Sequence, residues 1–319
     1  SKDIRKEYNI KNLCLAGGVA LNCVANGKLL KEKIFDNIWI QPAAGDAGGS
    51  LGAALALWYS EENNIRQINL RDSMQGSYLG PEYLQNEIEE ELKNVGAKFS
   101  VIDEDELIDK TANDLSNEMA IGWFQGRMEF GPRALGARSI LSDPRSESTQ
   151  KNLNLKVKYR ESFRPFAPSI LKEDLSTWFQ LDIDSPYMLI VANINKEKTI
   201  EMKEEQKKLF GIDKLNIKRS QIPAVTHVDY SARIQTVHKD TNEKYYKLIS
   251  KFKEKTGCPV LVNTSFNVRG EPIVNTPTNA FNCFMGTELE RLIIGNCYLK
   301  KEDQDISLKK DYSKKFELD

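Results

Sequence analysis

The stretch VLVNTSFNVRGEPIV, residues 260–274, begins with three apolar residues and continues directly into small hydroxyl and amide side chains. A short apolar run bounded by polar residues is typical of a buried strand. One such polar residue would indicate only a turn. Because Asn263, Thr264, Ser265 and Asn267 all follow the same run, we predict that this strand end forms a ligand-binding edge.

Cations precede that edge in two stretches of the chain. VKYRESFRPFAPSIL (157–171) contains Lys158, Arg160 and Arg164 beside a turn, and GRMEFGPRALGARSIL (126–141) contains Arg127, Arg133 and Arg138 among glycines. Guanidinium groups bind phosphate oxygens in bidentate fashion, and lysine supplies a compact charge. Charge runs are most often solvated surface, but these cations alternate with Gly, Pro and aromatic residues rather than helix formers. We therefore predict a cation-lined cavity in a phosphate-handling enzyme.

The overall composition excludes several other classes. The 319 residues include 45 Lys and Arg against 46 Asp and Glu, so the whole chain has no net attraction to nucleic acid or to a membrane surface. Locally, residues 127–164 hold nine Lys and Arg against four Asp and Glu. The length is sufficient for two domains.

Cysteine usage and hydropathy indicate the compartment. No two of the five cysteines have the spacing of a metal site, and we predict reduced, mostly buried thiols. No apolar stretch approaches the length of a membrane span, and no secretory signal opens the chain. We expect a cytoplasmic protein. Because the chain enters regular structure almost at once, we also expect that an N-terminal part of the fold precedes it.

Periodicity predicts an α/β fold in two units. Strands at 12–16 and 37–41 alternate with a helix at 19–33 and an Ala/Leu helix after residue 46, which is the pattern of a mainly parallel unit. A linker follows at 63–77. In the second unit we predict helices and strands in alternation, an exposed charged insertion and a polar tail; the predicted ranges are helices 82–95, 104–119 and 242–256, a strand at 187–194, the insertion at 196–220 and polar residues from about 300 onward.

Three weaker motifs have two interpretations each. In LAGGVALN (15–22), Gly17 and Gly18 are suited to a phosphate cradle or to an ordinary β-to-α turn. Asp46 is suited to holding a metal at a nucleotide phosphate or to capping a helix, and the glycines around it favour a ligand. His227 and His238 are the only histidines and are not spaced as a metal pair on one helix face. His227 and Arg233 lie near another predicted strand end.

Taken together, six ordered motifs resemble one family. They are GGVALN (17–22), PAAGDAG (42–48), GRMEFGPRALGARSIL, KYRESFRPFAPSIL, HVDYSARIQTV (227–237) and NTSFNVRGEPIV (263–274), and they extend over most of residues 12–300. This set is similar to the O-carbamoyltransferases of the nodulation and antibiotic-tailoring type.

The resemblance implies a two-domain architecture. Residues 1–70 would be the C-terminal part of an actin-like (ribonuclease-H-like) carbamoyl-transfer domain. Residues 71–305 would be an α+β YrdC-like domain, whose K-x-R and S-x-N signature matches Lys158-Tyr159-Arg160 and Ser265-Phe266-Asn267. Residues 306–319 would be a polar tail.

The resemblance also implies a two-step reaction. The YrdC-like domain would form carbamoyl-adenylate from carbamoyl phosphate and ATP with Mg²⁺, and the actin-like domain would pass the carbamoyl group to a hydroxyl of a sugar or small-molecule acceptor. Its site residues would divide into four groups: Arg133, Lys158, Arg164 and Arg233 on phosphates; Asn263 and Ser265 orienting the carbamoyl and phosphoryl groups; Arg160, Asn267, Gly17, Gly18, Asn22 and His227 on nucleotide; and Asp46 on a divalent metal, with iron expected.

Two alternatives stay open at this point. One is a threonylcarbamoyl-adenylate synthase, which would use threonine and bicarbonate, and the other is a nucleotide-binding module without catalysis. The family's two histidine metal ligands are absent from this chain, so we expect it to keep the adenylate-forming site and to transfer poorly on its own. The acceptor is not specified by the sequence, no nucleic-acid or membrane partner is expected, and a homodimer is left open.

Overall fold

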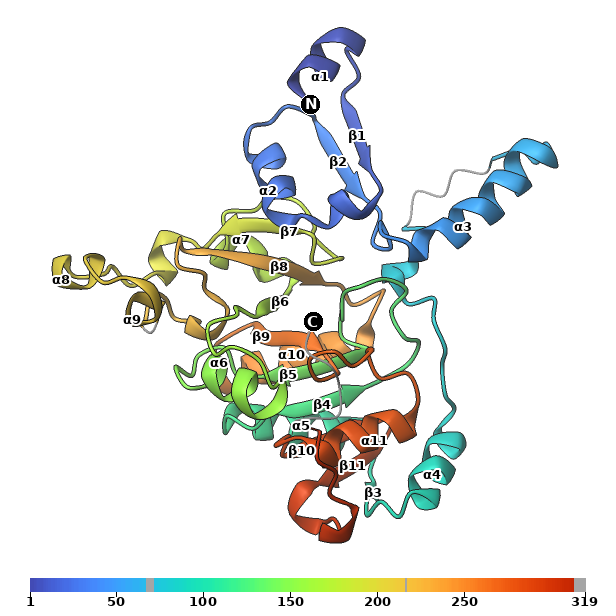
Figure 1. Ribbon diagram of the computed structural model, residues 1–319, viewed down its shortest axis with the longest axis vertical. Coiled ribbons are helices and arrows are strands. Elements are labelled where there is room, and N and C mark those ends of the chain that lie inside the picture. The colour runs from blue at the N-terminus through green and yellow to red at the C-terminus, as the bar shows by residue number, and fades with distance from the viewer. Residues whose placement is uncertain (67–71, 216, 313–319) are drawn as a thin grey trace.

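The computed structural model describes residues 1–66, 72–215 and 217–312. Within them the chain forms a small two-stranded sheet and a large nine-stranded sheet with helices on both faces (Figure 1). The strands are β1 Asn12–Leu15, β2 Asn37–Ile40, β3 Ser100–Val101, β4 Ile121–Phe124, β5 Arg138–Ser142, β6 Ala167–Leu171, β7 Ile190–Asn193, β8 Ser231–Val237, β9 Val260–Ser265, β10 Arg291–Ile294 and β11 Cys297–Lys300.

The helices vary from single turns to more than three turns. They are α1 Lys2–Tyr8, α2 Cys23–Lys31, α3 Ala47–Ala56, α4 Gln85–Asn94, α5 Glu104–Ser116, α6 Thr149–Asn152, α7 Leu175–Trp178, α8 Glu204–Lys207, α9 Gly211–Leu215, α10 Glu243–Thr256 and α11 Pro277–Gly286. The α/β class predicted from periodicity is therefore confirmed, in the form of a mixed α/β fold built on one large mixed sheet.

The nine strands lie in the order β3-β11-β10-β4-β5-β9-β6-β8-β7. The pairs β10–β4 and β6–β8 are parallel, and the other pairs are antiparallel. Strand β9 lies at the centre, where Asn263 is opposite Leu141 on β5 and opposite Ala167 on β6. The predicted ligand-binding strand thus runs through the middle of the sheet, with a neighbour on each side to hold its end in place.

Helix α10 covers one face of the sheet, and its sequence shows why. Its buried residues Tyr245, Leu248, Ile249 and Phe252 recur at helical spacing and form one apolar face. Asn242 caps the start by accepting a hydrogen bond from the Tyr245 N–H, and Gly257 ends the helix in the left-handed conformation at φ 74°. Helix α5 packs beside α10 on this face, and α11 and α4 pack against each other on the other side (Figure 1).

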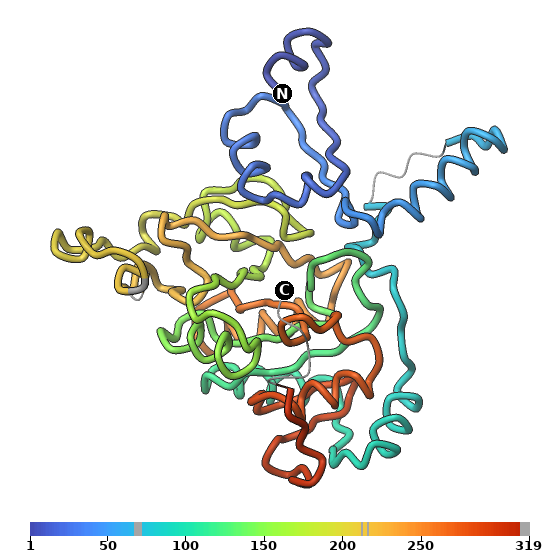
Figure 2. Tube along the Cα trace, in the orientation of Figure 1, coloured from blue at the N-terminus to red at the C-terminus, as the bar shows by residue number. Residues whose placement is uncertain are grey.

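The N-terminal unit β1–α2–β2 packs on the β7 edge of the large sheet (Figure 2). Asn26, which is buried in α2, donates from Nδ2 to the carbonyl oxygens of Ala20 and Leu189, at 2.8 and 3.0 Å. Its neighbour Gly27 is so close to β7 that a Cβ there would lie 2.1 Å from the Val191 carbonyl oxygen. Helix α3, by contrast, has no buried residue and extends away from the sheet (Figures 1 and 2).

Several predicted ranges change in detail. The predicted helix 19–33 divides into a 3-10 turn at Gly18–Leu21 and α2, because the Asn22 side chain caps α2 by accepting from the Ala25 N–H. The insertion 196–220 forms short turns and the exposed helices α8 and α9 (Figure 1). In the predicted tail, Tyr312 is buried with its ring against Gly286. Residues 67–71 of the predicted linker and 313–319 lie outside the described residues.

Candidate functional site

One cavity, of about 250 Å³, brings several of the predicted site residues together. We call it the arginine cavity. It lies over the end of β9 and takes residues from five separate parts of the chain: Pro132, Arg133, Ala134, Arg160, Arg164, Pro165, Phe166, Ala167, Met188, Arg233, Asn263, Thr264 and Ser265. Six of the predicted residues are among them, although they are far apart in the sequence.

Three of the four arginines in this cavity have no carboxylate partner among the residues that the structure describes. Arg164 forms an ion pair with Glu161, with 3.0 Å between Nε and the carboxylate oxygen, whereas Arg133, Arg160 and Arg233 form none. Arg160 donates from Nε to the Asn154 Oδ1 at 2.7 Å, and Arg133 donates to the Leu21 carbonyl oxygen at 3.4 Å. The cavity is therefore rich in donors and positive charge that the protein itself does not neutralise.

The pKa values of these guanidinium groups reflect that surplus of positive charge. Burial, followed by the charge of the nearby Arg133 guanidinium, lowers the pKa of Arg233 to about 10. Burial followed by the Arg164 charge lowers the pKa of Arg160 to about 10, and burial lowers the pKa of Arg133. All three groups stay cationic at neutral pH, so the cavity holds like charges close together. Such an arrangement is stabilised by a bound polyanion.

A second hollow of about 280 Å³ adjoins the arginine cavity and shares Arg160, Arg164 and Ser265 with it. Its other lining residues include Lys158 and Asn267, so both halves of the K-x-R and S-x-N signature face this region. The two hollows together are large enough for a ligand with several phosphate groups.

Lys158 is a buried clamp rather than an open phosphate ligand. Its side chain reaches four oxygens: the carbonyl and Oγ of Ser265 at 2.8 and 3.2 Å, and the carbonyl and Oδ1 of Asn267, both at 2.7 Å. An ammonium group has only three protons, so these contacts use its full donor capacity. Burial lowers the pKa of Lys158 to about 7, with the Arg160 charge as the second cause.

The residue between Lys158 and Arg160 has an unusual backbone conformation. Tyr159 has φ 47°, in the left-handed region that residues other than glycine seldom adopt. Its hydroxyl donates to the Gly286 carbonyl oxygen at 2.8 Å, which anchors the turn to the end of α11. This turn directs Lys158 to the end of β9 and Arg160 to the cavity, as strained backbone at functional sites often does.

The arginines of residues 126–141 divide between function and structure. Only Arg133 lines the arginine cavity. Arg138 is fully buried, donates to the carbonyl oxygens of Gln125, Gly126, Ala137 and Pro81, and lies 3.5 Å over the Phe124 ring. Arg127 is an exposed residue paired with Glu82 at 3.5 Å.

The remaining predicted residues lie apart from the arginine cavity. Asn22 is occupied as the cap of α2, whereas Gly17 and Gly18 are exposed, and a Cβ added at either glycine would meet nothing within 4 Å. His227 has its Nδ1 at 3.0 Å from the Ser231 Oγ, and burial lowers its pKa. His227 is electrostatically close to Arg233 but does not line the cavity.

Asp46 does not form a metal site by itself. It is exposed at the start of α3 and makes no capping hydrogen bond, so the helix-cap interpretation is not fulfilled either. Across residues 1–66, 72–215 and 217–312, no group of three or more His, Cys, Asp or Glu converges on one point. One exposed carboxylate does not fit the ligand set of a firmly bound metal.

Sequence reasoning missed several residues around the cavity. Cys23, at the start of α2, lies close enough to Arg233 to affect its pKa. Ser169 lies on the adjacent strand β6 and Gln235 on β8, the strand beyond it, and both bond to Asn263. Alternation along β6 and β8 could have indicated that these polar residues share a face with Ala167 and Arg233, but periodicity does not reveal the pairing of β6, β8 and β9.

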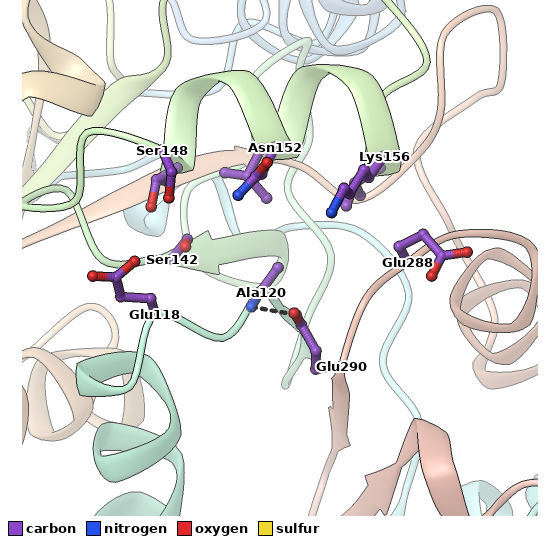
Figure 3. Close-up of a pocket in the computed structure, with 11 residues that line it drawn as sticks. Glu118, Ala120, Ser142, Ser148, Asn152, Lys156, Glu288 and Glu290 are labelled. Atoms are coloured by element: carbon purple, nitrogen blue, oxygen red, sulfur yellow. Dashed lines mark hydrogen bonds between the residues drawn. The ribbon is translucent and has the colours of Figure 1, made fainter.

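A third hollow is unrelated to this site (Figure 3). It has a volume of about 80 Å³ and lies between the turn of residues 148–156 and the segment that carries Glu288 and Glu290. Glu290 accepts a hydrogen bond from the Ala120 N–H at 2.7 Å, and none of the predicted site residues is present. This hollow is too small for a nucleotide.

The described part of the chain contains no helix long and apolar enough to cross a membrane. Its cysteines are all free, and Cys258, Cys283 and Cys297 are buried, whereas Cys14 is exposed. The predicted burial of most thiols agrees with this arrangement.

Comparison with known protein families gives two matches. The carbamoyltransferase C-terminus family matches residues 112–301, and the carbamoyltransferase N-terminus family matches residues 1–55. The first match includes every residue of the arginine cavity.

Individual relatives are similar over most of this chain. An uncharacterised protein of Synechocystis is 56% identical over 99% of the chain and 52% of its own length. The nodulation protein NolNO of Sinorhizobium fredii is 42% identical over 92% of the chain and 40% of its own length. The 3'-hydroxymethylcephem-O-carbamoyltransferase of Streptomyces clavuligerus is 30% identical over 91% of the chain and 49% of its own length. The chain thus spans about half the length of the curated relatives it matches.

Among solved structures, full-length HypF with phosphate and nucleotide bound has a TM-score of 0.37 and 14% identity, over 65% of this chain and 22% of that one. This likeness is too low to assign a fold.

Proposed function

Because this chain belongs to the carbamoyltransferase family, we propose that its arginine cavity binds carbamoyl phosphate and the phosphates of ATP and forms carbamoyl-adenylate. In the complete protein the carbamoyl group would then pass to a hydroxyl of an acceptor. The fold, the cavity and the relatives all support this proposal, and the cavity supplies its chemical basis.

The main support is the set of three half-buried arginines without carboxylate partners among the described residues, Arg133, Arg160 and Arg233. Bringing two polyanions together is opposed by their mutual repulsion, and fixed cations remove that repulsion without reorganising during the reaction. Guanidinium groups held by the backbone are suited to this task because their planar donors match phosphate oxygens.

The reaction balances with one water. Water cleaves the bond between the carbamoyl and phosphoryl groups of carbamoyl phosphate, which gives carbamate and phosphate. A carbamate oxygen then becomes bonded to the α-phosphorus of ATP as pyrophosphate leaves, which gives carbamoyl-adenylate. In this scheme Arg133, Arg160, Arg164 and Arg233 bind the phosphates, and Asn263 and Ser265 orient the carbamoyl group. Mg²⁺ would arrive on the nucleotide phosphates, as it commonly does in phosphoryl-transfer sites. Lys158 would hold Ser265 and Asn267 in position.

The transfer step is proposed for the complete protein rather than for this chain. By family likeness, residues 1–70 would be part of an actin-like transfer domain and residues 71–305 a YrdC-like domain. Asp46 would supply one ligand to a metal there, and its companions would have to come from outside the described residues. The curated relatives include a protein named for O-carbamoylation of a cephem and proteins named for nodulation, so a hydroxyl on a sugar or small molecule is the acceptor class that we propose.

The test is release of pyrophosphate by this chain from ATP and Mg²⁺ with and without carbamoyl phosphate, together with the mass of the carbamoyl-adenylate formed. We expect release that depends on carbamoyl phosphate and that falls at least about 100-fold in Arg233→Gln, since removal of one preorganised charge donor has effects of this size. Arg127→Gln is the matched control, because Arg127 is exposed and does not line the cavity.

Other outcomes separate the alternatives. Release that requires threonine and bicarbonate instead would identify a threonylcarbamoyl-adenylate synthase. ATP binding without release under any of these conditions would contradict an adenylate-forming site in this chain and leave a nucleotide-binding module.

A further inference from the structure

One residue on the floor of the arginine cavity differs from the rest in its hydrogen bonding. Asn263 is fully buried and lines the cavity, and its Oδ1 has no hydrogen-bond partner among the described residues. An amide oxygen buried without a donor is costly, so a native structure that keeps one calls for an explanation. The other polar side chains around it are mostly cationic donors, which makes a free acceptor at this point unexpected.

The orientation of the Asn263 amide is fixed by its neighbours. Its Nδ2 donates to the Ser169 Oγ at 3.0 Å and to the Gln235 Oε1 at 2.8 Å, so both of its N–H groups are used. Turning the amide over would place its oxygen against the Gln235 oxygen, which cannot donate. The Gln235 amide would therefore have to turn as well.

Gln235 cannot turn, because of a backbone group. Its Nε2 donates to the Leu135 carbonyl oxygen at 2.7 Å, and a carbonyl can only accept. A turned Gln235 would place two oxygens in contact there. In this arrangement the Ser169 hydroxyl donates to the Gln235 Oε1 at 2.5 Å. The Leu135 carbonyl thus fixes the direction of donation in this series of hydrogen bonds. It orients the Gln235 amide, which orients the Asn263 amide and leaves the Asn263 Oδ1 without a donor.

We propose that Ser169 and Gln235 hold Asn263 with its amide oxygen presented to the ligand, so that the cavity selects a substrate bearing an NH₂ group beside its phosphate. This inference rests on the proposed function and makes it more specific. Carbamoyl phosphate has an amide NH₂ where acetyl phosphate has a methyl group, and only the NH₂ can donate to Oδ1. Ser169 and Gln235 act through Asn263 and are positioning residues.

The free energy of leaving the Asn263 Oδ1 unpaired favours discrimination between ligands with and without the NH₂ group. An analogue without the NH₂ would leave the buried oxygen unpaired, and sites built around a hydrogen bond reject such analogues more strongly than apolar pockets reject a missing methylene. An unpaired buried acceptor corresponds to a difference in affinity between about 5-fold and 100-fold.

A matched pair of stable ligands tests the proposal by calorimetry, without any requirement for turnover. Phosphonoacetamide carries the NH₂, and acetonylphosphonate has a methyl group in its place with the same phosphonate. We expect this chain to bind the amide at least about 10-fold more tightly than the ketone. In Gln235→Leu, where Asn263 is no longer held, the ratio should fall to about 2-fold or less, with the affinity for the ketone unchanged within about 2-fold.

Thr236→Val is the control. Thr236 is the next residue on β8, is buried, and bonds to Ser185 on the other side of the sheet, so its substitution removes a comparable polar group without touching Asn263. The ratio should stay at the wild-type value in this variant. Ser169→Ala, which removes one hydroxyl, should give an intermediate ratio and serves in place of Gln235→Leu if that variant does not fold.

Two results would overturn the proposal in different ways. The first is that the wild type binds the two ligands with equal affinity, or that the ratio stays unchanged in both Gln235→Leu and Ser169→Ala. Either observation would show that Ser169, Gln235 and Asn263 do not select an NH₂ group, and neither would contradict the phosphate site. If neither of the two ligands nor inorganic phosphate binds, that result would contradict the proposed function, and with it the inference that depends on it.

Discussion

At the scale of single residues, the pKa of Lys158 leads to a prediction about stability. Burial lowers that pKa to about 7 in the folded protein, whereas an unfolded chain has a lysine pKa of about 10.4. Between these values the unfolded state binds more protons than the folded state, so the free energy of unfolding rises with pH. Between pH 7 and pH 9 we expect a gain on the order of 2 kcal/mol from this group, measured by urea unfolding.

Lys158→Met identifies the source of that gain. The variant loses the four contacts to Ser265 and Asn267 and should be less stable at every pH. It should also lack the pH-dependent gain, so the difference between wild type and variant should widen from pH 7 to pH 9. A difference that stays constant across this range would mean that Lys158 is not the group that titrates.

The residue scale also shows what the sequence could predict about the site. Arginine beside Gly, Pro and Phe, and a strand that ends in amides and hydroxyls, were sufficient to select residues that now line one cavity. Chemical type alone could not separate Arg133 from Arg138, since both stand two residues after a glycine, and only the structure shows that four backbone carbonyls surround Arg138. The clamp role of Lys158 depends on a backbone turn at Tyr159 that no propensity indicates.

At the scale of elements, the loop of residues 126–137 is held by one carboxylate and one close contact. The Glu129 Oε1 accepts hydrogen bonds from the N–H groups of Leu135, Ala137 and Arg138, at 2.6, 2.8 and 3.4 Å. Gly136 has φ 107°, and a Cβ there would lie 2.3 Å from the Tyr245 ring on α10. The loop that presents Arg133 is thus fixed to the helix layer behind the sheet.

Gly136→Ala should therefore destabilise the protein by roughly 2 to 6 kcal/mol, because backbone strain and overpacking each contribute about 1 to 3 kcal/mol. Gly126→Ala is the matched control in the same loop, since Gly126 has φ 53° with nothing within 4 Å of a Cβ. Backbone strain alone should reduce its stability by about 1 to 2 kcal/mol. Equal losses in the two variants, measured by urea unfolding, would rule out the Tyr245 contact as the constraint.

Elements with strong local signals were predicted well. Helices α5 and α10 combine a capping side chain with an apolar face, and β9 is a short apolar run with turn residues after it. The boundary near Asn22 was wrong because a single capping hydrogen bond ends one turn and begins the next helix. The order of the nine strands depends on pairings such as β5–β9 and β6–β9 between distant segments, and periodicity contains no information about them.

At the scale of the whole molecule, the arginine cavity lies close to the junction of the two sheets. In the N-terminal unit, the Leu21 carbonyl accepts a hydrogen bond from Arg133, and Cys23 lies close enough to Arg233 to affect its pKa. Asn26 fastens the same unit to the carbonyl oxygen of Leu189, directly before β7. Its position on the β7 edge therefore controls the surroundings of two cavity arginines, and the site depends on contacts between segments that fold on different sheets.

Gly27→Ala tests whether that junction holds the unit in place. The added Cβ would meet the Val191 carbonyl oxygen at 2.1 Å, so α2 must move off β7. We expect a larger radius of gyration by small-angle X-ray scattering and faster amide exchange in α2, while the buried strands β4 and β9 keep their protection. Gly49→Ala in α3 is the control: a Cβ there meets nothing within 4 Å, and alanine is favoured over glycine in a helix by about 1 kcal/mol. If Gly27→Ala scatters and exchanges as the wild type does, the contact between α2 and β7 does not determine the position of the N-terminal unit.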